Sequence, residues 1–241
     1  MASSTPADTP VRRAATVVVL RPSASGAEVL MVRRSRSARF MGNARVFPGG
    51  AVDAADAGPS ARSVVRWTGD PEEFDWRAAA LREVAEEAGI VIGTGQPLEG
   101  VGAGAPAEAV YASAATSGVT FDADRLAYVG NWLTPLGMSR RFDTRFYFAV
   151  VDRDAEPSTD DREVFDAVWV RPQEAFAKGD SGEWAVELPT RTMLWLVDGF
   201  GSPDEAFAYA ATVGSVDRIE PRIVLGDDGA RVLLPSRGAR R

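Results

Sequence analysis

Short apolar runs bounded by turn residues mark the strands of this chain. The run 15–20 (ATVVVL) is β-branched and apolar, which is typical of a buried strand, and a second run covers 28–33 after a turn-rich stretch. Because only a short turn separates these two runs, we expect a hairpin. The same pattern predicts further strands at 126–133, 144–151 and 164–170, and a C-terminal hairpin whose runs, 223–225 and 232–234, flank the sequence GDDG.

A helical period replaces the strand pattern between 75 and 88. Apolar residues recur there at helical spacing, and Gly89 follows them as a C-cap. Further helices are predicted at 106–115, 172–177, 189–200 and 203–213. Strands and helices mixed in this order, without an internal repeat or a long linker, predict an α+β fold. We expect a flexible tail at 1–13 and a single domain over 14–241.

The composition narrows the chemistry that this chain can carry. The 241 residues are 45% hydrophobic and include neither cysteine nor histidine. Disulfides, thiolate nucleophiles and imidazole bases are therefore excluded. If the protein is an enzyme, its acid–base and metal chemistry must come mainly from carboxylates.

Charge and hydropathy bear on partners and location. The net charge of -7 and the pI near 4.8 argue against a protein that binds nucleic acid or a membrane surface. No apolar run has the length of a membrane-spanning helix, and the N-terminus has no apolar signal core. We therefore expect a cytoplasmic protein with neither kind of partner.

The predicted helix at 75–88 carries an acidic face. Glu83, Glu86 and Glu87 fall within about a 100° arc of the helix, and their charges repel one another unless a cation or an arginine neutralises them. Clustered glutamates supply the oxygen ligands that hard divalent cations require. The alternative is a solvated acidic stripe, the usual state of exposed charge. Against it stands the glycine pair Gly49 and Gly50 upstream, where backbone can approach a ligand closely.

Together these segments resemble the Nudix hydrolases. Their signature is Gly, five residues, Glu, seven residues, then Arg-Glu-U-x-Glu-Glu-x-Gly-U, in which U is aliphatic. Gly50 matches the first glycine, and the stretch 82–90 (REVAEEAGI) matches the second half. Asp56 stands at the position of the first glutamate, and twenty-five residues, not seven, separate it from Arg82. An insertion at about 57–75 thus splits the motif, and the role of the first glutamate stays open between Asp56 and Glu73.

The split motif is similar to a branch of the family that includes the mammalian peroxisomal coenzyme A diphosphatase. Three segments carry this likeness: the first half-motif FPGGAVDAAD, the coenzyme-A-associated stretch 30–50, and the pair NWLTP and RRFDTRF at 131–135 and 140–146. The resemblance implies the Nudix α/β/α sandwich, a mixed sheet between helices. The insertion in the motif and the extra C-terminal helices would enlarge it.

The resemblance also implies roles for the acidic residues. Glu83, Glu86 and Glu87, with Gly50 beside them, would hold Mg²⁺ or Mn²⁺, and Arg82 would complete the catalytic set. The general base would be Glu83 or a carboxylate of a later loop, for which Asp160, Asp161 and Glu163 are candidates, with Glu163 placed in the catalytic set. The alternative for these last three is an acidic surface loop.

An arginine-rich stretch near the glycine pair is the candidate substrate site. Guanidinium groups suit phosphates because they present paired donors. We expect substrate contacts from Arg34, Arg39, Arg45, Gly49, Gly50 and Arg141. The alternative for each arginine is a solvent-exposed side chain with a carboxylate partner.

The function implied is metal-dependent hydrolysis of a small-molecule nucleoside diphosphate. Coenzyme A or acyl-coenzyme A would be cleaved to (acyl-)4′-phosphopantetheine and adenosine 3′,5′-bisphosphate. The alternatives are a pyrophosphatase for ADP-ribose, NADH or a dinucleotide, or a Nudix-fold module that binds a ligand without turnover. A homodimer is the assembly that the resemblance allows.

Overall fold

A computed structural model describes residues 9–34, 44–98, 100–159, 164–226 and 229–234. Its centre is an eight-stranded mixed sheet with the strand order β10-β2-β1-β9-β8-β11, in which β3 pairs with β2 and β4 with β1. The strands are β1 (Val11–Ser23), β2 (Gly26–Arg34), β3 (Arg45–Val46), β4 (Gly49–Ala51), β8 (Ala127–Leu133), β9 (Arg141–Val150), β10 (Val164–Val170) and β11 (Arg218–Ile219).

The strand β1 organises this sheet. It forms the predicted antiparallel hairpin with β2, and on its other side it runs parallel to β9. It begins at Val11, which pairs with Arg141, so residues 11–13, which the apolar pattern assigns to the tail, lie in the sheet. The pattern misses them because their side chains are exposed; backbone pairing holds them in the sheet, and Arg13 also pairs with Asp75 and lies over the ring of Trp76.

Both faces of the sheet are covered. Val17 and Val19 point to one face of β1 and Val18 and Leu20 to the other, and all four are fully buried. The continuous apolar run in the sequence therefore reflects a strand between two layers.

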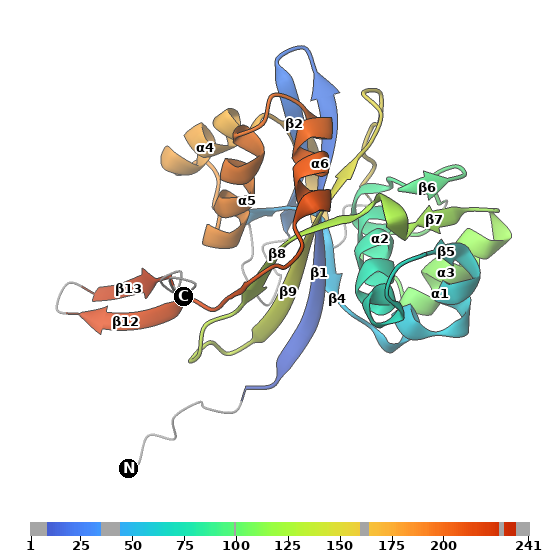
Figure 1. Ribbon diagram of the computed structural model, residues 1–241, viewed down its shortest axis with the longest axis horizontal. Coiled ribbons are helices and arrows are strands. Elements are labelled where there is room, and N and C mark those ends of the chain that lie inside the picture. The colour runs from blue at the N-terminus through green and yellow to red at the C-terminus, as the bar shows by residue number, and fades with distance from the viewer. Residues whose placement is uncertain (1–8, 35–43, 99, 160–163, 227–228, 235–241) are drawn as a thin grey trace.

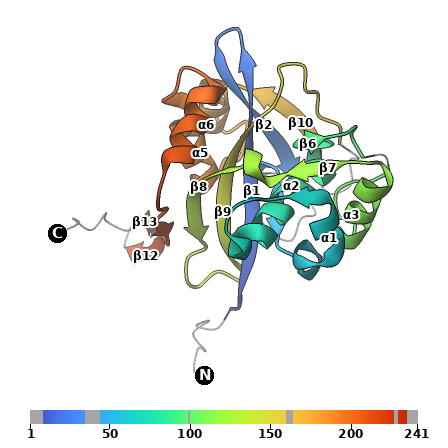
Figure 2. The ribbon, with the colours of Figure 1, turned by 45° about the vertical axis from the view of Figure 1, so that its right-hand side comes forward.

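Helices form those two layers (Figures 1 and 2). The first layer comprises α1 (Pro59–Val64), α2 (Phe74–Ala88) and α3 (Ala107–Thr116), and the second α4 (Pro172–Asp180), α5 (Leu188–Asp198) and α6 (Pro203–Thr212). The expected sandwich, with a mixed sheet between helices, is confirmed.

The helix α2 packs its apolar face on the sheet. Leu81, Val84 and Ala88 are fully buried in the core that includes Val17 of β1. Gly89 ends the helix with a φ of 65°, a left-handed conformation that glycine adopts without strain. The predicted helix and its C-cap are thus confirmed within one residue.

The two segments that the sequence left without a role pack against each other. The insertion in the motif forms α1 and β5 (Val65–Arg66), and the stretch after α2 forms β6 (Gly93–Thr94), α3 and β7 (Thr120–Asp122). A small sheet joins them in the order β5-β7-β6, and α1 packs on α3. Both segments therefore buttress α2 on the side away from the large sheet (Figure 1).

The C-terminal hairpin is also confirmed. Strands β12 (Arg222–Gly226) and β13 (Gly229–Leu233) pair only with each other among the described residues and project from the body (Figure 1). Ile223, Val224 and Val232 are exposed there. In the part of the chain that is described, no helix is long and apolar enough to cross a membrane.

Candidate functional site

The acidic face of α2 is organised around a buried arginine. The Nη1 atom of Arg82 donates hydrogen bonds of 2.8 Å to one oxygen of Glu83 and one of Glu86. Glu86 is 4% exposed and Glu87 is 7% exposed. The alternative of a solvated acidic stripe is therefore wrong for these two glutamates.

Asp56 is the second anchor of Arg82. It lies in a short 3₁₀ helix, Ala54–Ala57, and is fully buried. Arg82 donates to both of its oxygens, from Nε at 2.8 Å and from Nη2 at 3.1 Å, and Nη2 also donates to the carbonyl of Ala51. Glu73 instead forms an ion pair with Arg145 at the start of α2. The structure thus places Asp56, and not Glu73, against the arginine of the motif.

A tyrosine that the sequence reasoning missed completes this network. Tyr111 of α3 is fully buried, and its hydroxyl donates to Asp56 at 2.6 Å. Burial and the charge of Asp56 raise the pKa of this phenol, so that it stays a donor. The available signal was a single aromatic side chain in an alanine-rich helix, which does not identify its partner.

The glycine pair lies in β4, beside β1 and against α2. The backbone N–H of Gly49 donates to Glu87 at 2.9 Å. A Cβ atom on Gly50 would overlap the carboxylate of Glu83. Gly50 is therefore required by the close approach of the backbone to Glu83, whereas a Cβ on Gly49 would overlap Ala15 and Thr16 of β1.

Burial and mutual repulsion weaken the acidity of these carboxyls. Desolvation, followed by the charge of Glu83, raises the pKa of Glu86 to about 7. The same two causes hold the pKa of Glu87 well above its ordinary value. Although burial opposes it, the hydrogen bond to Asp56 and the charge of Glu83 keep the pKa of Arg82 above its usual value.

These residues fit a divalent cation in chemistry and in charge. Three buried or half-buried carboxyls surround one guanidinium and Glu87 lies on the same helix face, so a dication would offset the excess negative charge, and carboxylate oxygens are the ligands that hard cations prefer. Among the described residues, no three acidic side chains converge as they stand to hold an ion. Arg82 engages Glu83 and Glu86, and the N–H of Gly49 engages Glu87.

The candidate substrate arginines differ in their surroundings. Arg45 is buried, bonds to the carboxylate and carbonyl of Asp166, and stacks 4.6 Å from the ring centre of Trp184. Asp166 has a φ of 54° at an irregularity of β10, and nothing in the sequence signals it. Arg45 is thus held by the protein, and this arrangement does not direct it toward a substrate.

Of the other candidate arginines that the structure describes, Arg34 is the one whose charge reaches the glutamates. Its charge acts on the carboxyl of Glu87. Arg141, at the start of β9, bonds instead to the carbonyl of Thr134 and to Glu220. Arg39 and Glu163, as well as Asp160 and Asp161, lie outside the described residues.

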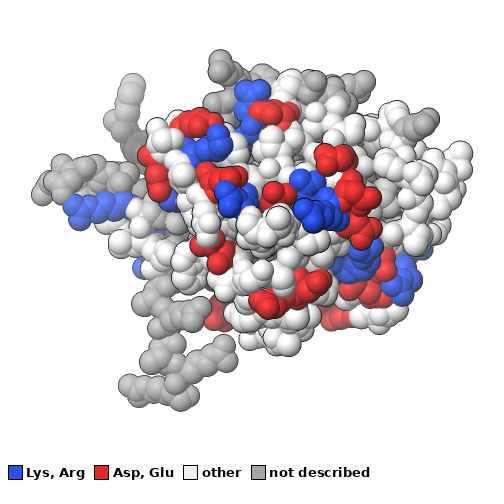
Figure 3. Space-filling model, turned by 90° about the horizontal axis from the view of Figure 1, so that it is seen from above, with Lys and Arg blue, Asp and Glu red and all other residues white. Residues whose placement is uncertain are grey.

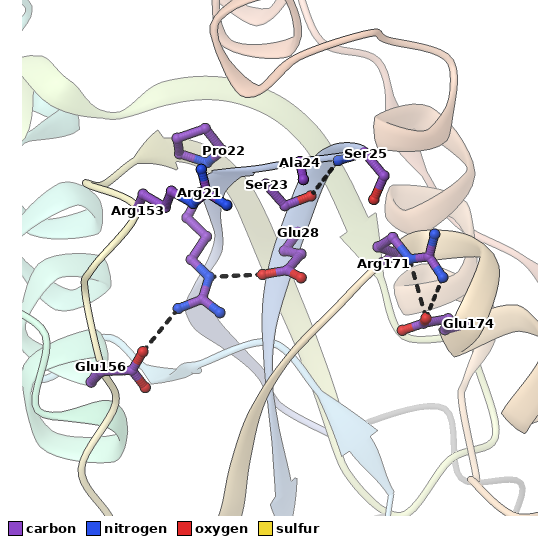
Figure 4. A pocket seen from close by; sticks show the side chains of 10 residues that line it. All are labelled: Arg21, Pro22, Ser23, Ala24, Ser25, Glu28, Arg153, Glu156, Arg171 and Glu174. Atoms are coloured by element: carbon purple, nitrogen blue, oxygen red, sulfur yellow. Dashed lines mark hydrogen bonds and ion pairs between the residues drawn. The ribbon is translucent and has the colours of Figure 1, made fainter.

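A separate surface hollow of about 350 Å³ lies at the turn between β1 and β2 (Figure 4). Arg21 there donates to Glu28 at 2.8 Å and to Glu156 at 3.2 Å, and Arg171 is paired with Glu174. In Figure 3, basic and acidic side chains are interleaved over the face seen from above. These arginines already have carboxylate partners, so the hollow is a weaker candidate than the acidic face of α2.

Comparisons with known proteins agree with the geometry. The NUDIX domain model matches residues 10–188. The "Putative nudix hydrolase 7" of Caenorhabditis elegans is 32% identical over 67% of this chain, which spans only 52% of that protein. "Acyl-coenzyme A diphosphatase NUDT19" of Gallus gallus is 28% identical over 86% of this chain and 71% of its own length.

A solved structure supports the same assignment. The NUDIX hydrolase from Alicyclobacillus acidocaldarius superimposes with a TM-score of 0.71 at 30% identity, over 83% of this chain and 96% of that one. The buried set of Arg82 and the glutamates lies within the residues that the family model matches, and the fold is similar to that of the solved NUDIX hydrolase. The chain therefore belongs to the Nudix family and is a Nudix hydrolase.

Proposed function

We propose that this hydrolase cleaves the diphosphate bond of coenzyme A or acyl-coenzyme A. The products would be (acyl-)4′-phosphopantetheine and adenosine 3′,5′-bisphosphate. The observation that carries the proposal is the split motif, reassembled by the pairing of Asp56 with Arg82 beside Glu83 and Glu86. The chicken relative named as an acyl-coenzyme A diphosphatase supports the substrate class.

Glu83, Glu86 and Glu87, with Gly50 beside them, would hold the cation, for which we propose Mg²⁺ or Mn²⁺. When bound, a divalent cation neutralises charge on the diphosphate and favours attack by water on phosphorus. Arg82 keeps two of the glutamates aligned on one face of α2. The N–H of Gly49 orients the third.

The remaining groups bind substrate and move the proton. Water adds to one phosphorus, the bridging P–O bond breaks, and the proton of the water passes to a carboxylate, either Glu83 or Glu163. Arg34, whose charge acts on Glu87, would bind the diphosphate, and Arg39 and Arg141 would bind the outer phosphate. Arg45 would act through Asp166, by fixing the end of β2 from which Arg34 projects.

The test is incubation of the protein with coenzyme A and either Mg²⁺ or Mn²⁺, followed by separation of the products. We expect the two named products in equal amounts, and no cleavage in excess chelator. Catalytic efficiencies for ADP-ribose, NADH and a dinucleotide polyphosphate should all be lower. A preference for one of those would leave the diphosphate chemistry intact and overturn the substrate; no cleavage of any of them would overturn both.

A further inference from the structure

The helix α3 reaches the candidate site through one side chain. Among the described residues of α3, Tyr111 is the one that bonds to the network around Arg82. Its ring is fully buried in the core shared by α2 and α3. The segment after α2 thus contributes both apolar packing and a single polar contact to the site.

The hydroxyl of Tyr111 bonds to the carboxylate of Asp56, and each oxygen of that carboxylate accepts two hydrogen bonds. The Oδ1 atom of Asp56 accepts from Tyr111 at 2.6 Å and from Nε of Arg82 at 2.8 Å. Its Oδ2 atom accepts from Nη2 of Arg82 at 3.1 Å and from the backbone N–H of Asp53 at 2.7 Å. Four donor atoms from three residues therefore fix the orientation of one fully buried carboxylate.

The orientation of Asp56 in turn sets that of Arg82. A guanidinium is planar and rigid, so the Nε and Nη2 bonds to Asp56 define the direction in which Nη1 points. That atom holds both Glu83 and Glu86 at 2.8 Å. A rotation of Asp56 would therefore be passed to two glutamates of the site.

We propose that Tyr111 is a positioning residue, whose hydroxyl locks Asp56 and through it aligns Arg82, Glu83 and Glu86 for the cation. This inference rests on the proposed role of the glutamates in binding a divalent cation. It assigns a role to α3, which lies outside the motif: the segment after α2 sets the geometry of the site without touching the substrate.

The test compares Tyr111→Phe with Tyr147→Phe. Tyr147 of β9 is also fully buried, but among the described residues its hydroxyl has no hydrogen-bond partner, and the arginine charges that act on it are those of Arg77 and Arg145. Both changes remove one buried hydroxyl and keep the ring. Mn²⁺ affinity is measured by calorimetry on chelator-treated protein, alongside melting temperature, kcat and KM for coenzyme A.

We expect Tyr111→Phe to weaken Mn²⁺ binding about ten- to a hundredfold, as the loss of a group that orients a ligand typically does. It should lower kcat by a similar factor with little change in KM. Tyr147→Phe should leave both within about twofold, whereas Tyr111→Phe should also melt lower because the buried carboxylate of Asp56 loses a donor. Equal Mn²⁺ affinity in Tyr111→Phe and Tyr147→Phe would overturn the inference.

A double-variant cycle removes the remaining ambiguity. We expect Asp56→Asn to lower Mn²⁺ affinity by itself, and adding Tyr111→Phe should lower it no further, because both act through one carboxylate. Independent, multiplying losses would overturn the inference. Wild-type protein that binds Mn²⁺ but does not cleave coenzyme A would defeat only the proposed substrate, whereas wild-type protein that binds no Mn²⁺ would defeat both proposals.

Discussion

At the scale of single residues, Arg82 connects the two halves of the split motif. It bonds to Asp56 from the first half and to Glu83 and Glu86 from the second. Three nitrogen atoms in a fixed plane serve these partners at once. The pairing replaces in space the contiguity that the insertion removes from the sequence.

Replacing Arg82 with lysine should therefore disable the site. A single ammonium cannot bond to Asp56 in two places and also hold two glutamates. We expect kcat for coenzyme A to fall about a hundredfold or more, together with a lower melting temperature because Asp56 loses buried donors. Steady-state kinetics and calorimetry check this, and a rate within a few fold of wild type would show that the arginine plays no such part.

The raised pKa of Glu86, about 7, has a consequence for the metal-free protein. A carboxyl whose pKa is higher in the folded than in the unfolded state binds more protons when the protein is folded. The free energy of unfolding therefore falls as the pH rises from the pKa of the unfolded chain toward 7. In excess chelator, the melting temperature should decrease by several degrees between pH 5.5 and pH 8, since a loss of 1 kcal/mol of stability lowers it by about 2–4 °C. Glu86→Gln should flatten this dependence; an unchanged slope would contradict it.

At the scale of elements, the sequence pattern predicted the features that depend on residues close together in the chain. The apolar spacing of α2, its glycine C-cap and the hairpin of β1 and β2 all appear where expected. Contacts between distant segments could not be predicted. The bond from Tyr111 to Asp56 and the engagement of Arg45 by Asp166 join residues 55 and 121 positions apart, and nothing in the local pattern encodes them.

The close approach of β4 to α2 can be tested at Gly50. A methyl group there would overlap the carboxylate of Glu83, so Gly50→Ala should displace that side chain. We expect Mn²⁺ affinity to fall about tenfold or more. Gly214→Ala is the matched control, because a Cβ at that position meets open space. Calorimetric titration of both variants decides, and equal affinities would refute the close approach.

At the scale of the whole molecule, the segments that enlarge the fold differ in what they contact. The insertion and the stretch after α2 pack on the helix that carries the glutamates, whereas β12 and β13 pair only with each other among the described residues. A two-stranded hairpin alone is marginally stable in water. The first two segments therefore belong to the site, and the hairpin stands outside it.

Truncation after Pro221 should accordingly be tolerated. It keeps β11 and the bond from Arg141 to Glu220, and it removes only the hairpin and the residues C-terminal to it. We expect the melting temperature to stay within about 3 °C of the full chain, which corresponds to about 1 kcal/mol, with unchanged kcat for coenzyme A. A much larger drop in scanning calorimetry would mean that the hairpin packs on the body.

The proposal as a whole depends on the buried glutamates of α2 carrying metal-dependent hydrolysis of coenzyme A. Its decisive test is the rate at which Glu86→Gln forms adenosine 3′,5′-bisphosphate from coenzyme A in saturating Mn²⁺, relative to wild type. We expect a loss of about a hundredfold or more in a variant that melts no lower than wild type in chelator, since a buried carboxyl is replaced by an uncharged amide. A near-normal rate in this variant would place the metal site elsewhere and refute the role of these glutamates.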